Sequence, residues 1–361
     1  MFSARLRALP LILVAGATLS AQTTGTLQGR VVDSSRAVVM GATVRIMGAN
    51  LQGTRTVLTG EDGTYRFGLL PPGSYIVTAN KDGLNPSKTT VQVGLDRTAS
   101  LDLMMAPVAS ATVEVVENIT TVDVKATTSG QNFTNETFQN LPIKRDFAAI
   151  ALLAPGVTED REGFKVYGGS GAENNYVVDG INTTGVEFGT QGKQVPVEFI
   201  QEFQVKTGGY EAEYGKATGG IINVITKSGG NEFSGDVFAY SEGQAFKTGN
   251  KHTNEGNLTK PLITSNKNFD YGFDFGGPIL RDKLWFFVAY DRRSNKTEQQ
   301  IRAAGPNLGD IAPRDSDRDL FAAKLTWKIT GSQTLIASVL GDPEKITGAV
   351  KTPQGSQGTW D

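Results

Sequence analysis

The chain has 361 residues, with 43 glycines, no cysteine, a single histidine (His252) and a formal net charge of −2. The absence of cysteine excludes a disulfide scaffold, a thiolate metal site and a cysteine nucleophile, and one histidine excludes a histidine-rich zinc centre. The balanced charge argues against nucleic-acid binding, and the glycine content, above the usual ~7%, predicts many turns between short strands. We therefore expect a mainly β protein with no cofactor, no metal and no nucleic-acid partner.

Residues 1–21 have the order of a secretory signal peptide. Arg5 and Arg7 precede an apolar run over residues 8–17, and Ala21 ends a small-residue stretch suited to cleavage. The apolar run is shorter than the ~20 residues of a transmembrane helix. A buried helix is the alternative, and the order of charge, apolar run and small residues disfavours it. We therefore expect an exported protein.

Residues 22–106 alternate between apolar and polar side chains and are divided by Gly, Pro and Asp turns. Ala42, Val44 and Ile46 share one face of a predicted strand, and short strands at this spacing are typical of a β-sandwich. The segment resembles the carboxypeptidase regulatory-like domain. The runs that carry the resemblance are LQGRVVD (27–33), GATVRI (41–46), TGEDGTYRFGLLPPGSYIVTANKDG (59–83) and VQVGLDRTASLDLMM (91–105).

This resemblance implies an accessory fold related to carbohydrate-binding modules. A peptidase is excluded, because a zinc carboxypeptidase needs two histidines and a glutamate. Tyr65, Phe67 and Tyr75 are candidates for stacking on a sugar. Their alternation favours the other reading, in which the rings pack in the core.

Residues 107–129 form a predicted linker that contains one β-prone run. Such a run can pair with the sheet edge of another protein, or it can be a connecting strand of the next domain. Both readings stay open. The residues of this candidate coupling strand are Thr112, Val113, Glu114, Val115, Val116 and Glu117.

Residues 130–230 begin with a predicted amphipathic helix, capped by Asp146 and ending before Pro155. The blocks that follow resemble the plug domain of TonB-dependent outer-membrane receptors, in particular the Oar-like branch. The matching runs, all in order, are NLP (140–142), RD (145–146), YVVDGI (176–181), IQEFQV (200–205), YEAEYG (210–215) and GGIINVITK (219–227). Two departures, VYGG at 166–169 and KTGG at 206–209, argue against transferring siderophore-receptor chemistry to this chain.

The resemblance implies a plug that sits inside a barrel and rearranges, which requires glycines at tight turns and polar contacts to the barrel wall. For each charged candidate, the alternative is a solvated surface side chain. The predicted turn and wall-contact residues are Arg145, Asp146, Asp179, Gly180, Tyr214, Gly215, Gly219 and Gly220.

Residues 231–361 change to longer alternating segments. Phe269, Tyr271, Phe273 and Phe275 share one face, with polar residues on the other, as in a transmembrane β-strand of ~9–11 residues. Trp285 and Tyr290 are suited to the aromatic girdles of such a barrel, and residues 315–319 are predicted to be a solvated loop. The predicted strands are 233–240, 268–276, 283–291, 320–329 and 334–340.

About five strands cannot close a receptor barrel of about 22 strands. We therefore expect the chain to be the N-terminal part of a TonB-dependent receptor, with residues 231–361 as a truncated barrel start. The implied partners are outer-membrane lipid, a periplasm-spanning TonB-type coupling protein and an extracellular ligand, such as an oligosaccharide or a peptide. The alternative is an exported carbohydrate-binding or adhesion protein that uses residues 22–106. An enzyme ranks third, because no nucleophile is accompanied by a base.

Overall fold

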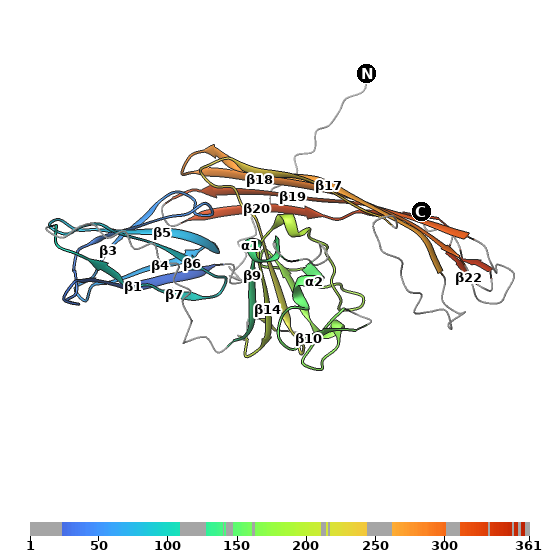
Figure 1. Cartoon of the computed structure of the whole chain (residues 1–361), viewed down its shortest axis with the longest axis horizontal. Coiled ribbons are helices and arrows are strands. Elements are labelled where there is room, and N and C mark those ends of the chain that lie inside the picture. Colours follow the sequence, from blue (N-terminus) through green and yellow to red (C-terminus); the bar gives the residue numbers. More distant parts are fainter. Residues whose placement is uncertain are drawn as a thin grey trace, which may run out of the picture.

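The protein, described by a computed structural model, is built from three β units (Figure 1). We call them the sandwich (residues 24–108), the plug (residues 128–227) and the wall (residues 234–347). The predicted mainly β fold is confirmed. The predicted signal peptide and coupling strand lie outside the described residues. The residues that the structure describes are 24–108, 128–139, 141, 147–160, 163–210, 214–215, 217–243, 262–300, 311–330, 333–348, 350–352 and 355–357.

The sandwich folds because apolar residues recur at every second position of its strands. Along β5, Tyr75, Val77 and Ala79 are buried, while the residues between them are less buried or exposed. One sheet contains β1 (Gly25–Asp33), β4 (Thr64–Leu70), β7 (Thr98–Ser100) and β8 (Leu103–Met105); the other contains β2 (Thr43–Met47), β3 (Arg55–Leu58), β5 (Gly73–Asn80) and β6 (Ser87–Val93).

The three aromatic candidates for sugar stacking lie in the core of the sandwich. Tyr65 and Phe67 are 3% exposed and Tyr75 is fully buried. The Tyr65 hydroxyl donates to the Leu101 carbonyl at 2.6 Å, and the Tyr75 hydroxyl donates to the Pro71 carbonyl. Since none of these rings presents a face to solvent, the burial supports core packing and argues against sugar stacking.

The plug contains a mixed sheet with the strand order β13-β12-β15-β14-β9. Its central strand, β15, is buried at every position, which explains its nearly continuous apolar sequence IINVIT. The strands are β9 (Ser129–Thr134), β12 (Asn175–Val178), β13 (Ile181–Asn182), β14 (Ile200–Gly208) and β15 (Ile221–Thr226). A small hairpin, two α-helices and two 3₁₀ turns accompany them: β10 (Val157–Glu159), β11 (Phe164–Val166), α1 (Asn135–Gln139), α2 (Phe147–Ala151), η1 (Gly171–Glu173) and η2 (Val197–Phe199).

The helix predicted to end before Pro155 is shorter than expected. It ends at Ala151, because the next turns are closed by tighter hydrogen bonds from the Leu153 and Ala154 amides to the carbonyls of Ile150 and Ala151. No helix within the described ranges is both long enough and apolar enough to cross a membrane.

The wall is an antiparallel sheet with the order β16-β17-β18-β19-β20, and β21 adds to β19. Its two outer strands are open edges within the described residues. The strands are β16 (Ser234–Gly243), β17 (Leu262–Leu280), β18 (Leu284–Gln300), β19 (Ile311–Lys328), β20 (Thr334–Gly341) and β21 (Glu344–Thr347); a separate hairpin joins β22 (Val350–Thr352) to β23 (Gly355–Gln357).

The central wall strands are longer than predicted, with 19, 17 and 18 residues in β17, β18 and β19. The loop prediction for residues 315–319 was wrong, because these residues lie in β19. Their charges pair across the sheet: Arg292 lies 2.8 Å from Asp319, and Arg318 pairs with Glu344. Cross-strand pairing of this kind lets a charged sequence continue as a strand.

The two faces of the wall differ as the alternation predicts. Phe269, Tyr271, Phe273 and Phe275 lie on the outer face and are 42–49% exposed. The girdle prediction for Trp285 was wrong: its side chain is fully buried, and its indole nitrogen donates to the Asn231 side chain at 2.7 Å. Its position in the two-residue repeat places it on the inner face.

A shared hydrophobic cluster holds the plug against the inner face of the wall. It contains plug residues such as Phe203 and Val224 together with Phe287, Ala289 and Ala322 of the wall. Figure 1 shows the plug beneath the long wall strands, with the sandwich toward one end of them. The cluster therefore makes plug and wall neighbours, while the sandwich keeps its own core.

We expect Gly29→Ala to destabilise the sandwich, because a Cβ at Gly29 would lie 1.7 Å from the Leu101 carbonyl oxygen. The overpacking should lower the free energy of unfolding of residues 24–108 by about 3 kcal/mol. Urea unfolding followed by circular dichroism measures this. Gly68→Ala is the matched control, because a Cβ there meets no heavy atom within 4 Å. Equal urea midpoints for the two variants would contradict the packing around Gly29.

Candidate functional site

The hairpin turn between β12 and β13 brings an acidic side chain to the wall. Asp179 and Gly180 both have positive φ angles, 48° and 81°, which is the conformation that an Asp-Gly hairpin turn favours. The Asp179 carboxylate accepts hydrogen bonds from the Thr226 amide at 2.9 Å and from the Thr226 hydroxyl at 2.5 Å. The turn is therefore fixed to the end of the neighbouring strand β15.

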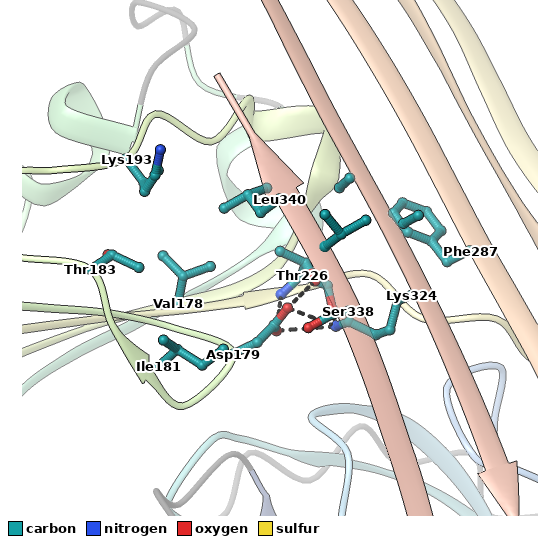
Figure 2. Close-up of a pocket in the computed structure, with 13 residues that line it drawn as sticks. Val178, Asp179, Ile181, Thr183, Lys193, Thr226, Phe287, Lys324, Ser338 and Leu340 are labelled. Atoms are coloured by element: carbon teal, nitrogen blue, oxygen red, sulfur yellow. Dashed lines mark hydrogen bonds and ion pairs between the residues drawn. The ribbon is translucent and has the colours of Figure 1, made fainter. Parts of the chain in front are cut away.

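Lys324 of the wall completes this contact, as Figure 2 shows. Its ammonium group lies 3.1 Å from the Asp179 carboxylate and donates to the Thr226 carbonyl at 3.0 Å. The side chains of Lys324 and Asp179 are only 7% and 18% exposed. An ammonium group this deeply buried is costly unless it is paired, so the contact ties the plug to one place on β19.

A cavity of about 180 Å³ lies beside this pair, between the plug and the wall (Figure 2). Both apolar and polar side chains line it. Its lining includes Val178, Ile181, Thr183 and Lys193 of the plug and Phe287, Ser338 and Leu340 of the wall.

Two further ion pairs join the same two units with the charges reversed. Lys227, directly after β15, lies 2.9 Å from Asp274 of β17. Lys193 lies 2.7 Å from Asp342, beyond β20, and the Gln194 amide donates to the same carboxylate at 3.1 Å. Since the acid comes from the plug in one pair and from the wall in these two, the pattern fits only one orientation of the plug.

Four of the predicted turn and wall-contact residues make contacts within the plug. A Cβ at Gly219 would lie 2.5 Å from the Asn174 side-chain oxygen, and one at Gly220 would lie 2.7 Å from Val166. Both glycines therefore allow close packing within the plug. The other two also make contacts within the plug: the Tyr214 ring lies 4.1 Å from the Lys206 ammonium group, and the Gly215 carbonyl accepts from Asn175 at 3.4 Å.

Of the predicted turn and wall-contact residues, the structure brings Asp179 to the wall, with Gly180 in its turn. Arg145 and Asp146 lie outside the described residues. In the described ranges, no group of three or more His, Cys, Asp or Glu side chains could hold a metal. What the arrangement provides is a set of paired charges that can hold two units together and separate without a covalent step.

Comparison with known proteins matches all three units. Residues 26–106 match the carboxypeptidase regulatory-like domain, residues 121–221 the TonB-dependent receptor plug domain, and residues 225–346 an outer membrane beta barrel domain. The chain is 36% identical over 291 residues to the TonB-dependent transporter Oar of Myxococcus xanthus, covering 77% of this chain and 27% of that protein. The chain belongs to the TonB-dependent receptor family.

Two further proteins are similar to this chain, one in sequence and one in fold. The chain is 29% identical over 231 residues to the probable TonB-dependent siderophore receptor PirA of Acinetobacter baumannii, covering 57% of this chain and 28% of that protein. The solved outer membrane transporter YddB from Escherichia coli has a similar fold, with a TM-score of 0.53 and 16% identity over 62% of this chain and 34% of that chain. This chain spans only 27% and 28% of the two curated relatives.

Sequence reasoning missed the wall partners of the receptor plug. Lys324 lies on the buried inner face of β19, but nothing in the sequence pairs it with Asp179, 145 positions away. Asp274 of β17 is likewise 47 positions away from its partner Lys227. The available signal is a charged residue on the inner face of a wall strand, because such a residue needs a partner on the plug.

We expect Lys324→Met to weaken the docking of the receptor plug, because it leaves Asp179 partly buried without its cation. The docked state should lose about 3 kcal/mol. Hydrogen exchange of residues 176–182, measured by mass spectrometry on the detergent-solubilised receptor, should become faster. Lys345→Met, which removes an exposed lysine of β21, is the control. Equal exchange in both variants would show that the pair does not hold the plug.

Proposed function

We propose that this chain forms the sandwich, the plug and the first wall strands of an outer-membrane receptor that imports a ligand by moving its plug. The observation that carries the proposal is the junction of plug and wall. Three ion pairs and a shared hydrophobic cluster hold the plug against the inner face of the wall. Ion pairs can exchange partners or take up water, so the plug can move without unfolding the wall.

The outer face of the wall supports a membrane location. Its exposed aromatic rings alternate with inner polar groups such as Asp274, which is 5% exposed. A sheet of this kind places aromatic side chains in lipid and polar ones in the interior of a barrel. We propose that the receptor is exported by the signal peptide of residues 1–21 and contacts outer-membrane lipid through this face.

The relatives support an energy-coupling partner. Oar and PirA are both described as TonB-dependent, so we propose that a TonB-type protein spanning the periplasm moves the plug of this receptor as well. The strand-like run at residues 112–117 is the proposed point of attachment. The proposed cargo is an extracellular ligand, with oligosaccharides and peptides as the first classes to test, and we propose no catalytic activity.

Deleting the plug should turn the receptor into an open pore. The test uses the longest natural reading frame that contains these 361 residues, with residues 130–226 replaced by a short Gly-Ser linker. We expect planar-bilayer conductance to appear, and cells producing this variant to become sensitive to vancomycin. The unaltered receptor is the control for both measurements. If the deleted form reaches the outer membrane and conducts no better than the control, the gating role of the plug is refuted.

Proline substitutions should disrupt the proposed attachment of the coupling protein. Proline removes a backbone donor and is excluded from the interior of a sheet, so Val113→Pro and Val115→Pro should weaken strand pairing. We expect binding of the periplasmic domain of the coupling protein to weaken at least about tenfold, or about 1.4 kcal/mol, in biolayer interferometry. Thr127→Pro, in the same linker, should bind normally. Unchanged binding by all three variants would exclude residues 112–117 as the attachment point.

A further inference from the structure

Strand β14 of the plug has a buried face made of polar side chains. Glu202, Gln204 and Lys206 alternate along this face and are 1%, 3% and 0% exposed. Phe203 and Val205, between them, point to the opposite face and join the apolar cluster of the plug. Buried polar groups require partners, so a second body must cover this face of the plug.

The body that covers it is the sandwich, through the turn between β6 and β7. The Leu95 amide of this turn donates to the Glu202 carboxylate at 2.7 Å. The Leu95 carbonyl accepts from the Gln204 side chain at 3.2 Å and from the Asn132 side chain, on the adjacent strand β9, at 2.9 Å. Both backbone groups of one sandwich residue are thus satisfied by the plug, and Leu95 is fully buried.

An ion pair lies beside these hydrogen bonds. The Lys206 ammonium group of the plug pairs with the Asp96 carboxylate of the sandwich, and their side chains are 1% and 10% exposed. The ring of Tyr214 lies 4.1 Å from the same ammonium group. Lys206 therefore has an aromatic neighbour within the plug and an anionic partner in another domain, which it loses if the sandwich leaves.

The sandwich also contacts the end of the wall at which β17 turns into β18. A Cβ at Gly53 would lie 2.7 Å from the Asp282 carboxylate in that turn, and a Cβ at Gly230 would lie 2.3 Å from the Ala49 carbonyl oxygen. Figure 1 shows the sandwich at this end of the long strands. The sandwich is thus placed across the end of the assembly that carries a short turn, the periplasmic end under the proposed function.

The chemistry of this interface differs from that of a permanent one. It rests on charges and amides, whose removal from water offsets much of what their pairing contributes. One oxygen each of Glu202 and Gln204 is buried without a hydrogen-bond donor among the described residues. An apolar interface between the same two surfaces would be harder to open. This polar interface is therefore suited to separation of the sandwich from the plug.

We propose that the sandwich is a releasable lock on the plug: residues 94–97 bind the polar face of β14 in the resting receptor and leave it before the plug moves. This inference rests on the proposed function, because a lock has meaning only if the plug is displaced. The segment that covers the polar face of β14 therefore belongs to the same chain. The lock adds a second constraint to the ion pairs at the wall.

The lock should respond to pH through Glu202. Burial raises the pKa of this carboxyl to about 7, above its usual 4.5, against smaller opposing effects of the Leu95 amide, Asn132 and Arg97. Among the residues that the structure describes, Asp96, Lys206, Tyr75 and Tyr214 are further ionisable groups at this interface. Because the docked state holds the extra proton, its advantage is complete below about pH 4.5 and is lost as the pH rises through about 7.

Hydrogen exchange on the full-length receptor in detergent tests the docking. Peptides covering residues 94–97 and β14 should exchange roughly tenfold faster in Asp96→Asn than in the unaltered receptor, while β1 to β5 keep their protection. Asp82→Asn, an exposed turn aspartate of the same sandwich, is the matched control. Raising the pH from 5.5 to 8.5 should weaken docking on the order of tenfold, after correction for intrinsic exchange, and Glu202→Gln should remove this dependence.

Planar-bilayer conductance at increasing urea concentrations tests the consequence for gating. Asp96→Asn should conduct at a lower urea concentration than the Asp82→Asn control. If the plug deletion conducts but Asp96→Asn changes neither exchange nor the urea threshold, the lock is refuted while the proposed function stands. If exchange rises but the threshold does not move, the sandwich docks without locking, and the proposal also fails. A plug deletion that does not conduct refutes the proposed function itself, whatever the exchange data show.

Discussion

A carboxylate or an ammonium group that leaves water is stable only beside a partner, and this constraint governs how the three units of the receptor fit together. Asp179 of the plug pairs with Lys324 of the wall, and Lys206 of the plug pairs with Asp96 of the sandwich. Neither group could be buried in an isolated plug without loss of stability. The plug is therefore a domain whose polar groups are completed by its neighbours, which makes its position depend on both of them.

Apolar and polar contacts have different roles in this arrangement. The cluster shared by Phe203, Phe287 and Ala322 removes apolar surface from water and holds the plug close to the wall, but such contacts are not directional. The ion pairs add direction, because a shift of one strand position would move Lys324 away from Asp179. The apolar contacts and the ion pairs together hold the plug firmly and in one orientation. Water can still replace each partner of an ion pair when the plug moves.

The sequence predicts the faces of this protein better than the contacts between them. Two-residue alternation predicts Phe269 on one face of its strand and polar residues on the other, and the structure exposes Phe269 and buries Asp274. The girdle prediction for Trp285 was wrong because its place in the alternation, and not its residue type, decides its face. The loop prediction for residues 315–319 was wrong because their charges have partners across the sheet. Glu202 and Lys206 were not identified at all, because their partners lie 107 and 110 positions away and a polar alternation is equally typical of a strand facing water.

The length of the wall strands has a consequence for how the receptor meets its surroundings. At about 3.4 Å per residue, the 19 residues of β17 extend for about 60 Å, whereas the apolar band of an outer-membrane barrel is only about 25 Å tall. Even with a tilt of about 40°, close to half of the strand stands clear of the hydrocarbon. The charged positions around Lys267, Lys296 and Asp315 lie beyond Phe269 along the sheet, in this projecting part, so the sheet continues as a collar in water. Under the proposed function, an extracellular ligand meets this collar, beyond the lipid surface, before it reaches the plug.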